Sequence, residues 1–220
     1  MSLQNVEKAR LNMIEQQIRP WNVDNSTVLE LLANVKREDF VPPAHKSLAF
    51  ADFAIPLPGG QSMLAPRLQA RLLQDAAVQP GNTVLEIGTG SGYFAALLAQ
   101  RAQRVISLEI NAELADMASA NLQQAGITNV EVRQADGSLG APAEAPFDVI
   151  VLGGSVAEVP QNLLDQLKVG GRLVALVGEE PIMHCMLITR TSPSNFKTVE
   201  MWDEVAPRLV NFPQLPAFTF

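Results

Sequence analysis

Cysteine and histidine are scarce in this chain. It has one cysteine, Cys185, which excludes an internal disulfide, and two histidines, His45 and His184. Neither histidine has a cysteine or a second histidine at a spacing that suits a metal ion, so we expect no metal site. His184 and Cys185 are adjacent and would face opposite sides of a strand, which disfavours a nucleophilic pair. We therefore expect Cys185 to be a small apolar core residue.

Positive charge is also in short supply. The chain has 16 Lys and Arg against 23 Asp and Glu, for a net charge of −7. A phosphate backbone requires clustered Lys and Arg, so we expect no nucleic-acid partner. No apolar run reaches the roughly 18 residues of a membrane helix, and residues 1–10 lack the apolar core of a signal peptide. We expect no membrane partner and a cytoplasmic location, whereas the oligomeric state is not indicated.

Hydrophobic residues are plentiful, at 47% of 220 residues, which is enough for a sizeable core. The length predicts a single domain, residues 1–220. Residues 1–78 comprise three predicted helices, at 6–18, 27–35 and 66–77, and a loop rich in proline and glycine before the third. Thr27 and Glu30 match a capping box at the start of the second helix. Residues 79–220 form an α/β core.

The α/β core is indicated by alternating strand and helix patterns. Strands are predicted at 83–87, 104–108, 130–133, 148–152 and 172–177, and helices at 93–102, 112–125 and 161–167. This alternation predicts a doubly wound, mostly parallel, Rossmann-like sheet, to which the N-terminal helices are an appendage. Two further β-rich runs, 182–190 and 197–202, flank a turn at 192–195 and predict an antiparallel C-terminal edge.

The sequence VLEIGTGSGY, residues 84–93, is the stretch most specific to a ligand. A buried strand leads into glycines at positions 88, 90 and 92, and a helix follows from Tyr93. A dinucleotide site would require G-x-G-x-x-G, but the third position is Tyr93. The acidic residue Glu86 precedes the glycines; it would repel a pyrophosphate and suit a ligand with an ammonium group and a sulfonium, as in S-adenosyl-L-methionine. The remaining alternative is a tight turn without a ligand, at a cost in backbone entropy.

Two further acidic residues follow neighbouring strands. Glu109 ends the second strand of the core, 21 residues after Gly88, where a carboxylate can accept hydrogen bonds from both ribose hydroxyls. Alternatively it is a charge at the start of the next helix, which Asn111 could cap. Asp136 follows the third strand at the same edge, although Asp-Gly is also common in simple turns.

These residues resemble the signature of class I S-adenosylmethionine-dependent methyltransferases, and other stretches narrow the resemblance to protein-L-isoaspartate O-methyltransferases. The similarity runs from about residue 9 to residue 210 and includes REDFVP at 37–42, GQ at 60–61, ADG at 135–137, APFD at 145–148, QL at 166–167, GGRLV at 170–174 and VGEE at 177–180. It implies a repair enzyme that transfers methyl to a carboxylate of isoaspartyl proteins or peptides and leaves S-adenosyl-L-homocysteine. The implied cofactor-binding residues are Glu86, Gly88, Thr89, Gly90, Gly92, Tyr93, Glu109, Ile110, Asp136 and Gly137, with Asp136 and the backbone of Gly137 beside the adenine.

The sequence departs from the family at the acceptor loop. The family has a stretch similar to GQTISQP, whose serine hydroxyl holds the isoaspartyl carboxylate, and Leu64 occupies that position here. Ser62, two residues earlier in an extended segment, would point to the same side and is the candidate catalytic hydroxyl. Ser155, after the fourth core strand, is another possible hydroxyl.

No general base is required, because a carboxylate acceptor is already ionised and the sulfonium carries its own leaving group. Three hypotheses follow: an isoaspartyl carboxyl methyltransferase, a methyltransferase of the same fold with another acceptor, and an S-adenosylmethionine-binding protein without catalysis.

Overall fold

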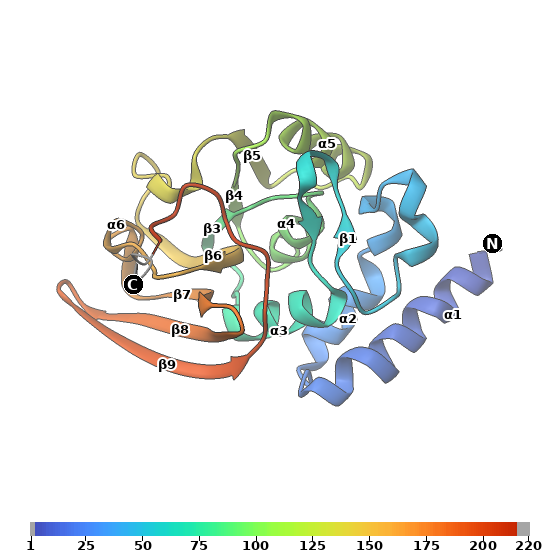
Figure 1. The fold of residues 1–220 in the computed structure, drawn as a ribbon, viewed down its shortest axis with the longest axis horizontal. Coiled ribbons are helices and arrows are strands. Elements are labelled where there is room, and N and C mark those ends of the chain that lie inside the picture. The colour runs from blue at the N-terminus through green and yellow to red at the C-terminus, as the bar shows by residue number, and fades with distance from the viewer. Residues whose placement is uncertain (1–2, 215–220) are drawn as a thin grey trace, which may run out of the picture.

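A seven-stranded sheet occupies the centre of the computed structural model, which describes residues 3–214 (Figure 1). The strand order is β5-β4-β3-β6-β7-β8-β9. Neighbours from β5 to β7 are parallel, and β8 and β9 join as an antiparallel hairpin at the edge. The strands are β3 (Thr83–Ile87), β4 (Arg104–Glu109), β5 (Val130–Gln134), β6 (Phe147–Val156), β7 (Leu167–Glu179), β8 (Ile182–Ser192) and β9 (Asn195–Asp203). The predicted doubly wound, mostly parallel sheet with an antiparallel C-terminal edge is confirmed.

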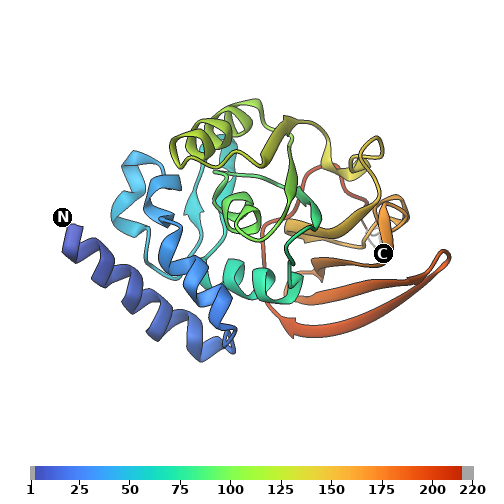
Figure 2. The same cartoon turned by 180° about the vertical axis from the view of Figure 1, so that it is seen from behind.

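Helices precede the sheet and alternate with its strands. They are α1 (Leu3–Met13), α2 (Ser26–Asn34), α3 (Pro66–Ala76), α4 (Tyr93–Ala99), α5 (Ala112–Gln124) and α6 (Gln161–Leu164). A π-helical turn, Ile14–Ile18, and a 3-10 turn, Arg19–Trp21, extend α1, and the left-handed residue Asn22 ends the helical run. Figures 1 and 2 show α1 at the end of the molecule opposite the turn of the β8–β9 hairpin, as an N-terminal appendage to the sheet.

The central strands bury alternate residues on two opposite faces, as the period of a strand requires. On β6, Val149 and Val151 belong to one core cluster, with α2, α3 and α4, whereas Ile150 and Leu152 belong to the other, with α6 and Phe212. Cys185 is fully buried in the first cluster, as predicted. The central strands are thus covered on both faces, and their carboxyl ends are open to form a site.

The loop between residues 40 and 66 is better ordered than its proline and glycine content suggests. It contains the 3-10 turns Pro43–Leu48 and Pro58–Gly60 and a short antiparallel pair, β1 (Ile55–Pro56) and β2 (Ser62–Met63). The pairing of Pro56 with Ser62 brings residues 61–64 back toward the start of α3. None of the helices described between residues 3 and 214 combines the length and apolar character needed to span a bilayer.

Several element boundaries differ from the sequence predictions, among them the start of α2 and the end of α6. The first turn of α2 is capped by Asn25, whose side-chain oxygen accepts from the backbone N–H groups of Thr27 and Val28 at 3.0 and 3.3 Å. The capping box predicted at Thr27 is therefore wrong, because a stronger cap lies two residues earlier. Helix α6 is shorter than predicted because β7 begins at Leu167.

Replacing Asn25 by alanine should lower the free energy of unfolding by about 1 kcal/mol, since two backbone N–H groups lose their acceptor. Thr27→Ala is the matched control and should change stability by less than about 0.5 kcal/mol. Urea unfolding followed by circular dichroism would compare the two. A larger loss of unfolding free energy for Thr27→Ala than for Asn25→Ala would show that Thr27, and not Asn25, caps the helix.

Candidate functional site

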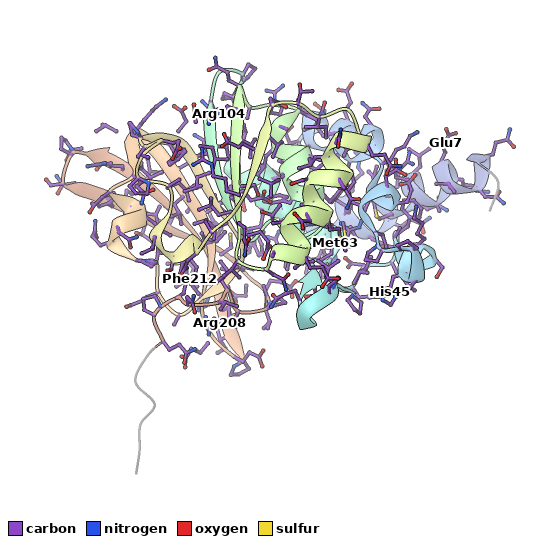
Figure 3. All side chains as sticks on the ribbon, turned by 90° about the horizontal axis from the view of Figure 1, so that it is seen from above. Glu7, His45, Met63, Arg104, Arg208 and Phe212 are labelled. Carbon is purple, nitrogen blue, oxygen red and sulfur yellow. The ribbon has the colours of Figure 1, made fainter. Side chains whose placement is uncertain are left out.

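A cavity opens at the carboxyl ends of the parallel strands. It is lined by the turn after β3, the ends of β4 and β6, the acceptor-loop residues before α3 and the segment after β9; the lining residues are Gln61, Ser62, Leu64, Ile87, Gly88, Gly90, Leu108, Glu109, Ile110, Leu114, Gly137, Gly153, Gly154, Pro207, Arg208, Leu209, Val210 and Phe212. Figure 3 shows Arg208 and Phe212 on the side of the molecule opposite Arg104, which begins β4. The cavity is therefore at the sheet edge where ligands of open α/β folds bind.

The glycine turn is held in a conformation that brings its backbone to the cavity. Gly88 and Gly90 have φ of +92° and +55°, in the left-handed region that favours glycine. A Cβ on Gly88 would meet the Leu209 side chain at 2.9 Å, and one on Gly90 would meet Leu57 at 3.3 Å. The N–H of Gly88 donates to Leu108 O at 2.8 Å, which fixes the turn to β4. These two positions leave little room for a side chain.

Glu109 joins the glycine turn to the loop after β4. Its carboxylate accepts from the backbone N–H of Gly90 at 2.9 Å and from that of Asn111 at 3.0 Å, and the residue is only 5% exposed. Asn111 also caps α5, through the N–H of Leu114 at 3.2 Å. A carboxylate has about four lone-pair sites, so two are left toward the cavity that Glu109 lines. Both interpretations of the sequence, a helix-start charge and a ligand-facing carboxylate, are compatible with this geometry.

Glu86 lies beneath the turn and lines neither this cavity nor the adjoining smaller one. The alternation of β3 turns it into the interior, where it is fully buried, and it accepts a 2.5 Å hydrogen bond from the Ser107 hydroxyl, which is also 2.6 Å from that of Thr89. Its other oxygen is buried without a partner among residues 3–214. Burial raises the pKa of Glu86 to about 8. A direct contact of Glu86 with a cofactor stays a prediction.

The remaining predicted cofactor residues are divided between the wall and the interior. Ile110 and Gly137 line the main cavity, whereas Thr89 and Tyr93 line the smaller cavity that adjoins it. Asp136 lines neither: its carboxylate accepts from the backbone N–H and hydroxyl of Ser138 and from the Asn211 amide at 2.9 Å. Gly92 lines neither cavity, because it packs against the backbone of α5.

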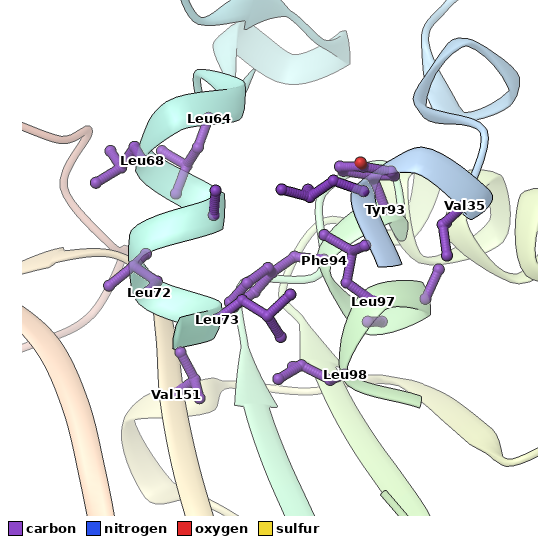
Figure 4. Close-up of a cluster of buried hydrophobic side chains, with 14 of the residues drawn as sticks. Val35, Leu64, Leu68, Leu72, Leu73, Tyr93, Phe94, Leu97, Leu98 and Val151 are labelled. Atoms are coloured by element: carbon purple, nitrogen blue, oxygen red, sulfur yellow. The ribbon is translucent and has the colours of Figure 1, made fainter. Parts of the chain in front are cut away.

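Leu64 lies at the boundary between the cavity and the core. Its side chain is 5% exposed and packs in the cluster with Leu68 and Phe94 (Figure 4), yet it also lines both cavities. Ser62 lines both cavities too, which is compatible with the expectation that these two residues face the same side. Ser155 is different: its hydroxyl is fully buried and donates to Ala206 O at 2.8 Å. The interpretation of Ser155 as an acceptor-side hydroxyl is therefore wrong, because the segment after β9 engages it.

Arg37 is a buried cation that sequence reasoning left without a role. Its guanidinium donates to Ala49 O at 3.0 Å, to Leu64 O at 2.7 Å and to the Gln69 side chain, and it lies 5.0 Å from the centre of the Tyr93 ring. Burial lowers the pKa of Arg37 to about 10, so it stays charged at neutral pH. It connects the loop, α3 and α4 directly behind the cavity.

The segment from Ala206 to Phe212 forms one wall of the site, and no motif in the sequence indicated it. The N–H of Ser155 donates to Pro207 O at 2.8 Å, and the N–H of Leu209 donates to Ser155 O at 2.9 Å. Phe212 is buried in the second core cluster. A lone arginine in an irregular tail carries no spacing signal, so only the three-dimensional structure places Arg208 at the cavity.

One cluster with metal-ligand chemistry lies on the edge hairpin rather than at the cavity. His184 on β8 approaches Asp203 and Glu200 on β9 at 2.7 and 3.2 Å, and none of the three lines the cavity. Cross-strand pairing unites them, which their spacing in the sequence does not indicate. The cluster is exposed or half-buried and has the character of a surface ion-pair group.

The comparisons with known proteins agree with this geometry. The family model described as protein-L-isoaspartate(D-aspartate) O-methyltransferase matches residues 8–205. The chain belongs to this family. A protein-L-isoaspartate O-methyltransferase of Syntrophobacter fumaroxidans is 42% identical over 88% of this chain and 90% of its own, and one of Gloeobacter violaceus is 41% identical over 82% and 88%.

The family fold is also seen in solved structures. A Plasmodium falciparum structure, described as a protein-L-isoaspartate O-methyltransferase in complex with S-adenosyl-L-homocysteine, has a TM-score of 0.77, 21% identity, and coverage of 91% of this chain and 97% of that one. At this identity the likeness concerns the fold. The resemblance stated from the sequence motifs is thus confirmed across most of the chain.

The buried Glu86 should make stability depend on pH. Its pKa is raised from 4.5 to about 8, so the folded chain keeps a proton that the unfolded chain releases. The stabilising contribution of the protonated Glu86 carboxyl is fully present below about pH 4.5 and is lost as the pH rises toward 8. Between pH 5 and 8, Glu86→Gln should gain stability over the wild type by on the order of 1 kcal/mol per pH unit in urea unfolding.

Glu131→Gln is the control for this experiment. Hydrogen bonds from Arg133 and Arg104 lower the pKa of Glu131 to about 2, so its contribution is constant above about pH 4.5. The difference between Glu131→Gln and wild type should not change between pH 5 and 8. A constant difference for Glu86→Gln as well would mean that Glu86 is ionised in the fold.

Proposed function

We propose that this chain transfers the methyl group of S-adenosylmethionine to the carboxylate of isoaspartyl residues in proteins or peptides. The observation that carries the proposal is a single cavity in which the glycine turn and Glu109 meet the acceptor-loop residues Ser62 and Leu64. The family match over residues 8–205 supports the same activity. The relatives from Syntrophobacter fumaroxidans and Gloeobacter violaceus are both named protein-L-isoaspartate O-methyltransferases.

The cavity wall suits S-adenosylmethionine. The turn at Gly88 and Gly90 allows the close backbone approach that the methionine part requires, because neither position has space for a larger side chain. The two free lone-pair sites of Glu109 suit the ribose hydroxyls. Apolar side chains of Ile87, Leu108 and Ile110 line the same wall and suit the adenine ring.

The residues of this chain need to position the acceptor rather than to activate it. Bound S-adenosylmethionine supplies an electrophilic methyl on a sulfonium. An acceptor carboxylate is ionised at neutral pH, so no base has to remove a proton, and neither His45 nor His184 lines the cavity. Leu64 excludes water from the inner end of the cavity. Ser62, which lines both cavities, is the hydroxyl closest in sequence to the missing serine and is proposed to orient the acceptor.

The two other hypotheses are not favoured. A changed acceptor would follow if the leucine at position 64 abolished carboxylate binding, and a protein without catalysis would bind S-adenosylmethionine only. Both are harder to reconcile with about 40% identity to isoaspartyl methyltransferases over more than four-fifths of the chain.

The proposed activity predicts that an isoaspartyl peptide acquires a base-labile methyl ester and that the matching aspartyl peptide does not. Methyl-labelled S-adenosylmethionine measures this between pH 6 and 8.

Glu109→Gln should weaken S-adenosylhomocysteine binding about 10- to 100-fold, because a hydrogen bond to a charged group is worth about 1.5–3 kcal/mol. Glu113→Gln, which changes an exposed residue in the first turn of α5, is the matched control and should bind as the wild type does.

Isothermal titration gives the affinities, and the peptide assay gives the acceptor. Strong S-adenosylhomocysteine binding with no methylation of any isoaspartyl peptide would reject the proposed acceptor. An unaltered S-adenosylhomocysteine affinity in Glu109→Gln would mean that Glu109 does not bind the cofactor and acts only as a charge at the start of α5.

A further inference from the structure

Arg208 is the one cationic side chain among the described residues that line the cavity. It is half-buried, and its Nη1 atom is buried without a hydrogen-bond partner within residues 3–214. The carboxylate of Glu109, the one acidic group on the wall, already accepts two backbone N–H groups. A buried guanidinium nitrogen without a partner is costly, and this cost is removed by a ligand that brings an acceptor atom.

The backbone around Arg208 is fixed. Ser155 pairs with Arg208 in a parallel bridge, and three hydrogen bonds of 2.8–2.9 Å link Ser155 to Ala206, Pro207 and Leu209. The Leu209 side chain packs over Gly88 and Gly154. Arg208 is therefore held at the cavity by the fold rather than by a flexible tail.

The strand order places Arg208 on the acceptor side of the glycine turn. Glu109 ends β4 and Gly137 follows β5, both on one side of β3, and we assign ribose and adenine to that side. Ser155, the partner of Arg208, lies on β6, on the other side of β3. Gly153, also on β6, adjoins Ser62 and Leu64 in the smaller cavity.

We infer that the guanidinium of Arg208 binds the carboxylate of the methyl acceptor, the task that a serine hydroxyl performs at position 64 in the family. This inference rests on the proposed function. Leucine offers no hydrogen bond, whereas arginine offers a planar fork that matches a carboxylate and keeps it ionised. Position 208 thus compensates for position 64 from a different segment of the chain.

The charge change of the reaction suits this arrangement. One carboxylate oxygen forms a bond to the methyl carbon as the sulfur–methyl bond breaks and its electron pair returns to sulfur. The products are a neutral ester and a neutral thioether. The ester has lost the charge that Arg208 attracts, so Arg208 binds the substrate more strongly than the product.

Arg208→Met tests the inference in the intact chain, with Arg208→Lys as the conservative variant and Arg104→Met, at the opposite edge of the sheet, as the control. We expect KM for an isoaspartyl peptide to rise about 10- to 100-fold in Arg208→Met, with kcat changed far less, because the carboxylate is held in the ground state as well. Arg208→Lys should recover part of the loss. S-adenosylhomocysteine affinity should stay within about twofold, which also shows that the variant is folded.

A second readout uses binding rather than turnover. Fluorescence anisotropy measures the affinity of a labelled isoaspartyl peptide for protein saturated with S-adenosylhomocysteine. This affinity should be weaker for Arg208→Met than for the wild type. The same peptide with its free carboxylate amidated should bind the wild type and the variant equally. An unchanged KM, or a parallel loss of S-adenosylhomocysteine affinity that assigns Arg208 to the cofactor carboxylate, would overturn the inference alone. A wild type that neither binds nor methylates the isoaspartyl peptide would overturn the proposed function as well.

Discussion

The buried guanidinium of Arg37 is the interaction on which the acceptor side of this protein depends. It binds the carbonyls of Ala49 and Leu64 and the side chain of Gln69, and it lies over the Tyr93 ring. A single charge thereby connects the loop before α3, α3 itself and the helix that follows the glycine turn. Without it, two buried carbonyls would lose their donors, and residues 61–64 would keep the β1–β2 pairing but lose this link to α4.

The cofactor side has a second anchor. Glu109 ties the glycine turn to the loop after β4, so the turn has a connection to the sheet that does not pass through Arg37. The site arises where these two anchored parts meet the segment after β9. This separation would allow the acceptor wall to change without a change in the glycine turn.

Features that depend on neighbouring residues could be predicted from the sequence, whereas features that depend on contacts between distant segments could not. Strand periodicity and the glycine spacing are local, so the order of elements, the parallel core, the edge hairpin and the position of the turn were predictable. The side to which Glu86 points follows from the alternation of β3, but its hydrogen bond to Ser107 joins residues 21 positions apart. Arg37, Arg208 and Asn211 act through partners between 12 and 75 residues away, and no spacing rule connects them. The cap at Asn25 was missed because four consecutive residues, 24–27, are all of types that favour an N-cap.

The central claim is that the cofactor wall and the acceptor wall are anchored separately. Arg37→Met tests it most directly, because methionine fills similar space while the donors to Ala49 O and Leu64 O are removed. Far-UV circular dichroism of the variant checks that it is folded. The account predicts that S-adenosylhomocysteine binds this variant within about twofold of wild type by isothermal titration, while kcat/KM for an isoaspartyl peptide falls about 100-fold through misplacement of the loop. Equal losses of both quantities, or full activity, would contradict it.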